Sequence, residues 1–178
     1  MSTRGGICRQ TGKDSFKGVY HHFDSYPDGL GQALWHVYHD AFQGDLPRML
    51  RVLCDEHPAG WSTILGNATT GGCADFSMEP GYVEFQNPDA DRLRARPMCY
   101  CHGDRSEDAD GTVDETAATD IFIEFVYVFT EDARMRILGK DRGLVGWREL
   151  ATVDLDGPEP DWEALPGLAW PDSEEGEP

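Results

Sequence analysis

The sequence lacks any run of about 18 consecutive apolar residues, the length that a membrane-spanning helix needs. The first residues also lack the apolar stretch of a secretory signal. We therefore expect a cytoplasmic protein with no membrane segment. Hydrophobic residues make up 39% of the chain and aromatic residues 11%. This is enough apolar material to build a core, so global disorder is not expected.

Positive charge is scarce. The chain has 15 Lys and Arg against 33 Asp and Glu, a net charge of −18. Such a field repels nucleic acid phosphates and anionic membrane surfaces, so direct binding to nucleic acid is not expected. Residues 104–120 hold seven acids and one base, and residues 154–178 hold nine acids with no Lys or Arg. These blocks indicate either a solvated surface with a tail, or an acidic surface that binds a basic protein partner.

No disulfide framework is indicated, because the cysteines number five and no secretory signal precedes them. The run Cys99-Tyr100-Cys101-His102 is one residue too short for c-type haem attachment, which needs two residues between the cysteines. Together with Cys73 it has the residue types of a three-cysteine, one-histidine zinc site. The spacing is shorter than zinc sites usually have, so free thiols without a cofactor are the favoured interpretation, and a zinc site is the alternative.

The first half of the chain predicts a hairpin followed by two helices. Residues 3–10 and 16–23 read as strands, because residues 11–15 between them supply turn chemistry. Apolar residues at helical spacing predict one helix that Gly44 ends. Asp45 is the expected N-cap of a second helix, which must end before Pro58.

The second half predicts mainly strands. Residues 121–130 are apolar on both faces except for Glu124, as in a central buried strand, and residues 134–138 and 144–155 should return beside it. A short strand is expected at 82–85, and residues 104–118 should form a flexible excursion.

We therefore predict an α+β fold, in which an N-terminal β-hairpin and two consecutive helices precede an antiparallel strand-rich meander. The strands form one sheet with the helices on one face. A single domain should cover residues 1–156, and residues 157–178 should form an acidic, proline-rich tail.

The segment from Tyr20 to Gly31 carries an unusual density of chemical groups, since it leaves a strand, turns, and enters a helix. If the hairpin turn centres near Lys13, Arg4 lies opposite His22. In a catalytic interpretation His22 is the general base, Asp24 orients it, Tyr26 donates a hydrogen bond and Arg4 holds an anionic substrate.

Other interpretations of this segment compete with catalysis. A metal site would use His22 and Asp24, although His21 should point to the other face of the strand. In a structural role Asp24 would cap the loop and Tyr26 would pack on the hairpin. A phosphate-binding loop is excluded, because the motif that starts at Gly29 lacks its third glycine and the acidic Asp28 would repel phosphate.

The same segment resembles a group of uncharacterised bacterial and phage proteins. Their N-terminal Arg-Gly-x-Ile-like strand is followed by a strand ending Tyr-x-His-aromatic-Asp-Gly/Ser-Tyr-Pro. The resemblance covers about the first third of the chain and implies no activity. The matching residues are Arg4, Tyr20, His22, Phe23, Asp24, Ser25, Tyr26 and Pro27.

Two classes of function follow from these patterns. The first is an accessory interaction protein of phage or mobile-element type, which binds a protein partner through its acidic surface. The second is a small hydrolase or transferase with a pocket formed by Arg4, His22, Asp24 and Tyr26. The extreme charge and the lack of a strong catalytic motif favour the first.

Overall fold

The fold begins with a β-hairpin at the centre of the sheet. The structure, a computed structural model, describes residues 3–82, 87, 89–102, 110–119, 122–140 and 146–165. Strand β1 (Arg4–Gln10) pairs antiparallel with β2 (Phe16–His21), and Gly5 lies opposite His21. The paired register begins at Gly5 and His21, one residue short of the predicted pair of Arg4 and His22.

Two helical segments follow the hairpin, as expected. The first ends where Gly44 adopts a φ of +82°, which a residue without Cβ adopts at little cost. The Asp45 side chain caps the second segment by accepting a hydrogen bond from the Arg48 N–H at 3.0 Å. The segments comprise η1 (Pro27–Gly31), α1 (Gln32–His36) and η2 (Val37–Ala41), then α2 (Leu46–Leu50) and η3 (Arg51–Asp55).

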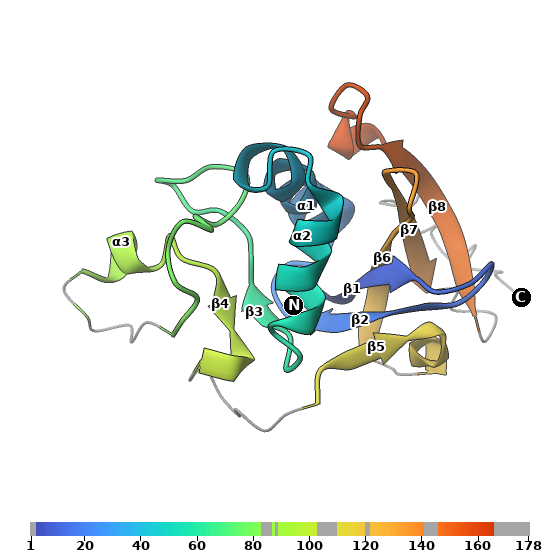
Figure 1. Cartoon of the computed structure of the whole chain (residues 1–178), viewed down its shortest axis with the longest axis horizontal. Helices are drawn as coiled ribbons and strands as arrows, with labels where there is room; N and C mark the ends of the chain where they lie inside the picture. Colours follow the sequence, from blue (N-terminus) through green and yellow to red (C-terminus); the bar gives the residue numbers. More distant parts are fainter. Residues whose placement is uncertain are drawn as a thin grey trace, which may run out of the picture.

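The remaining strands complete one sheet in the order β4-β3-β2-β1-β6-β7-β8, with β5 paired to β2 (Figure 1). The predicted α+β class is confirmed. The sheet is mixed rather than wholly antiparallel, because β6 runs parallel to β1 and β3 runs parallel to β2. Parallel neighbours need a crossover, and the helices provide it between β2 and β3. The strands are β3 (Trp61–Thr63), β4 (Met98–Cys99), β5 (Thr112–Asp114), β6 (Ile123–Phe129), β7 (Arg134–Lys140) and β8 (Trp147–Asp154).

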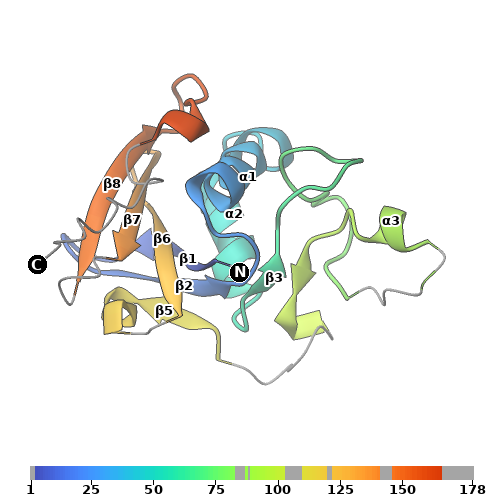
Figure 2. The same ribbon diagram turned by 180° about the vertical axis from the view of Figure 1, so that it is seen from behind.

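Each face of the sheet buries apolar side chains. The helical segments lie over the middle of the sheet, with β3 and β4 at one end and β7 and β8 at the other (Figures 1 and 2). Leu34, Met49 and Leu53 pack there on Ile7 and Tyr127. The opposite face buries a smaller cluster under β5 and the 3₁₀ turn η5 (Glu115–Thr119). That cluster contains Cys8, Phe16, Val113, Ile123, Val126, Val128 and Leu138.

Several expectations need correction or fall outside the described residues. The stretch 104–118 is not wholly an excursion, because Val113 is buried and its strand β5 pairs with β2. Of the strand expected at 82–85, only Tyr82 is described. A short helix α3 (Ala90–Leu93) follows.

The start of the predicted tail packs on the domain. Trp162 lies in the 3₁₀ turn η6 (Trp162–Ala164), is only 4% exposed, and belongs to the main core. Among the described residues, no helix combines the length and the apolar character needed to cross a membrane.

Candidate metal centre

A tight turn between η3 and β3 positions one histidine. The Gly60 N–H donates to the His57 carbonyl at 3.0 Å, and Gly60 has a φ of +84°. A Cβ on Gly60 would lie 2.5 Å from the Tyr20 carbonyl oxygen, so only glycine fits here. The turn sets the His57 ring against Trp61, with ring centroids 4.5 Å apart, and leaves His57 6% exposed.

Two cysteines reach the same place from the neighbouring edge strand. Cys99 in β4 pairs across the sheet with Trp61, and the Tyr100 N–H donates to the Gly60 carbonyl at 3.0 Å. The chain then makes the 3₁₀ turn η4 (Tyr100–His102). The turn folds the chain back, and Nδ1 of His102 lies 2.7 Å from Sγ of Cys99.

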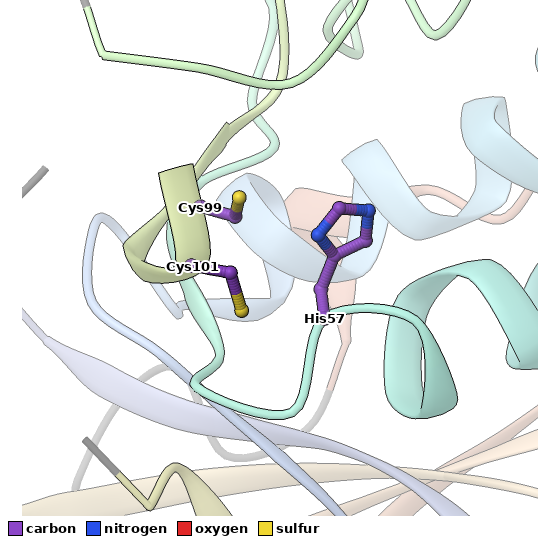
Figure 3. A group of neighbouring side chains, drawn as sticks. All are labelled: His57, Cys99 and Cys101. Carbon is purple, nitrogen blue, oxygen red and sulfur yellow. The ribbon is translucent and has the colours of Figure 1, made fainter. Parts of the chain in front are cut away.

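The ligand atoms of His57, Cys99 and Cys101 all lie within 4.8 Å of one another. The three side chains converge from two segments, and a ring nitrogen of His57 faces the side of the two cysteines (Figure 3). Nδ1 of His57 is buried and has no hydrogen-bond partner among the residues that the structure describes. Buried polar atoms nearly always have a partner, but Nε of Arg4, Nε2 of His39 and Nε of Arg96 share this status, so what distinguishes His57 is the two neighbouring thiols.

Without a metal ion, the surroundings of the cluster favour the uncharged form of the Cys99 thiol and of the His57 imidazole. Burial, together with the neighbouring Cys101, raises the pKa of Cys99 to about 12. Burial and the nearby His102 lower the pKa of His57, so its imidazole is neutral at pH 7. A divalent cation reverses this balance for the thiols, because it stabilises thiolates. The Ala59 N–H, which donates to Sγ of Cys101 at 3.4 Å, also suits a thiolate.

The structure brings together three of the four residues predicted for a metal site. Cys99, Cys101 and His102 are neighbours, but Cys73 does not belong to the cluster. Cys73 bridges to Leu65 and lines a separate cavity of about 470 Å³. His57 takes its place. Sequence reasoning missed it because 42 residues separate His57 from Cys99, and its only local signal was a turn with Pro58 and Gly60.

The predicted catalytic residues each make different contacts. His22 is 7% exposed, and its Nδ1 lies 2.7 Å from the Tyr20 hydroxyl. The Arg4 guanidinium lies over the exposed Phe122 ring at 5.0 Å, while the Asp24 side chain points to solvent. Tyr26 packs on Phe125 with ring centroids 5.8 Å apart. A further cavity of about 440 Å³ is lined by Arg9, Thr11, Lys17, Gly18, Val19, Cys54, Asp55, Pro58 and Thr112.

His21 has a structural environment. It is fully buried, its Nε2 accepts a hydrogen bond from the Ile64 N–H at 3.2 Å, and Nδ1 lies 2.9 Å from Oγ of Ser25. With Nε2 as acceptor, Nδ1 carries the proton and donates to Ser25. Burial, and then the charge of His22, lower the pKa of His21 to about 3. The Ser25–His21 pair is therefore neutral and closed to solvent, which does not suit a nucleophile and its base.

No family model matches the chain, and neither a curated protein nor a solved structure is similar to it. Function must therefore be inferred from the residues themselves.

Proposed function

We propose that this chain is a zinc-binding protein whose ion is held by His57, Cys99 and Cys101. The observation that carries the proposal is the buried Nδ1 of His57, which has no partner among the described residues and faces two cysteines. Leaving such an atom unpaired costs about 1–3 kcal/mol. Coordination to a metal supplies the missing partner.

The donor set favours zinc over the hard cations. Calcium and magnesium take oxygen ligands, whereas imidazole and thiolate together suit Zn²⁺. With Zn–S near 2.3 Å and Zn–N near 2.05 Å, tetrahedral ligand atoms lie about 3.6–3.8 Å apart. The three ligand atoms lie within 4.8 Å of one another, so closing on the ion requires movements of about 1 Å or less.

The ion would join two segments that the sheet holds only weakly. Strand β3 has three residues and β4 has two, and their pairing includes a register shift between Trp61 and Thr63. Zinc at this end of the sheet would tie the turn at His57 to η4 and add its binding free energy to folding.

Metal content after exposure to zinc tests the proposal. The full chain is dialysed against zinc and then buffer, and bound metal is measured by mass spectrometry. We expect one zinc ion per chain for the wild type and for the matched control Cys73→Ser. His57→Ala and Cys101→Ser should each lose it. Equal zinc content in all four proteins would contradict the proposal.

A second function, binding of a basic protein partner, is supported by an acidic face on α1, η2 and the chain after β8. The Tyr38 hydroxyl donates to Asp156 at 3.0 Å, and His36 contacts Asp40 at 3.0 Å and Glu159 at 3.4 Å. All three carboxylates are exposed. Such a face speeds the encounter with a basic surface and disfavours binding to an acidic surface.

Salt-dependent binding of a lysine-rich peptide tests this second function. Neutralising the face with Asp40→Asn, Asp156→Asn and Glu159→Gln should weaken binding and flatten its salt dependence. The control removes equal charge at exposed acids on other elements. Equal loss in both triple variants would mean that only net charge matters. The control substitutions are Asp14→Asn, Glu56→Gln and Asp110→Asn.

A further inference from the structure

Three protein ligands leave one position open on a tetrahedral zinc ion. A catalytic site keeps this position for water or substrate, whereas a structural site fills it with a fourth side chain. Whatever occupies it therefore determines whether the proposed centre can perform chemistry. The inference that follows rests on the proposed zinc site.

His102 contacts the cluster without belonging to it, since among the described residues the group of ligand atoms within 4.8 Å of one another contains only His57, Cys99 and Cys101. Nδ1 of His102 is 2.7 Å from Sγ of Cys99, and its ring centroid is 5.2 Å from that of His57. The 3₁₀ turn η4 begins directly after Cys99 and brings His102 back beside it. Cys99 at the end of β4 and His102 at the end of η4 therefore lie side by side.

The present contact is a hydrogen bond and must lengthen for both groups to coordinate. A sulfur and a nitrogen bound to one tetrahedral zinc ion lie about 3.6 Å apart, so the two atoms must separate by about 0.9 Å. The His102 side chain is exposed, and it must also turn toward His57 and Cys101, because it lies outside their group of close ligand atoms. Cys99 and Cys101 each lose a thiol proton to solvent as their Zn–S bonds form. Two thiolates, two neutral imidazoles and Zn²⁺ sum to zero charge, which suits the buried end of the site.

We propose that His102 is the fourth zinc ligand, so that His57, Cys99, Cys101 and His102 form a closed, structural centre. The centre then offers no coordination position to a substrate. Its role is to hold η4 against the turn at His57.

Cobalt substitution of the full chain tests this assignment, because Co²⁺ absorption reports both ligand number and thiolate ligands. In the wild type and in the control His36→Ala, added imidazole should leave the cobalt spectrum unchanged, since no position is open. His102→Ala should bind cobalt more weakly, and its spectrum should change when imidazole fills the open position. A His102→Ala chain that binds no cobalt while the control binds it supports the assignment equally.

A variant that exchanges the fourth ligand for a thiolate distinguishes coordination by residue 102 from a merely structural role. His102→Cys should raise thiolate-to-cobalt charge-transfer absorption by about half, because three thiolates replace two. A wild type that responds to imidazole as His102→Ala does, or a His102→Cys chain with unchanged absorption, would overturn the assignment and leave the three-ligand site intact. If no protein binds cobalt or zinc, the proposed function itself fails.

Discussion

Replacing His57 with phenylalanine should have opposite effects on stability with and without zinc. The substitution removes the buried, unpaired Nδ1, which costs about 1–3 kcal/mol when nothing binds it. The larger ring recovers much of the contact with Trp61 but adds volume at a buried site, which costs about 1 kcal/mol. We therefore expect His57→Phe to be about 1 kcal/mol more stable than the wild type in the presence of a chelator.

Zinc should reverse the order of the two proteins. At a free concentration 100 times the dissociation constant, a ligand that binds only the folded state stabilises it by about 2.7 kcal/mol. The wild type gains this amount and His57→Phe does not, so the wild type becomes the more stable by about 1.7 kcal/mol.

Urea unfolding followed by tryptophan fluorescence, with chelator or with zinc, measures both differences. Near-ultraviolet circular dichroism of the folded variant controls for a disturbed core. If His57→Phe is equally destabilised under both conditions, His57 is an ordinary core residue, and the reasoning from its unpaired nitrogen is wrong.

Three further predictions concern His21, Gly60 and Trp162. The pKa of His21 is lowered to about 3 in the folded state, against 6.5 in the unfolded state, so its contribution to stability is complete above pH 6.5 and is lost as the pH falls toward 3. Urea unfolding should show that the chain loses about 2–3 kcal/mol of stability between pH 7 and pH 4.5, and that His21→Gln largely removes this pH dependence. Gly60→Ala should destabilise the chain by about 2 kcal/mol or more and weaken zinc binding, because the new Cβ meets the Tyr20 carbonyl oxygen at 2.5 Å. Unchanged stability would mean that the turn relaxes freely. Trp162→Ala should cost about 3–5 kcal/mol, because a core side chain is deleted; a loss below about 1 kcal/mol in thermal unfolding would show that the segment after β8 is not part of the cooperative core.

The local elements follow from short-range patterns. The hairpin and its register depend on one turn and the alternation of its arms, so the pairing of the two arms could be predicted in advance. The Asp45 cap is a contact over three residues. The central position of β6 follows from its apolar character on both faces, because only a strand covered on both sides buries both.

The sheet pairings between distant segments were not predictable in the same way. Nothing in residues 112–114 distinguishes a three-residue strand from a loop until Val113 meets the core beside Cys8. The parallel pairing of β1 with β6 likewise joins segments more than 100 residues apart, and no local signal specifies it.

The amino-acid sequence by itself determined the α+β class, the hairpin, the two helical segments with the Asp45 cap of the second, and the presence of a Cys-x-Cys-His run with zinc-binding residue types. Only the tertiary structure decided which groups meet. It excluded Cys73 and brought His57 to Cys99, because β3 and β4 pair at the end of the sheet and Gly60 turns the chain there. Ligand identity depends on contacts over 42 residues, and the side-chain packing that creates them is a property of the folded chain.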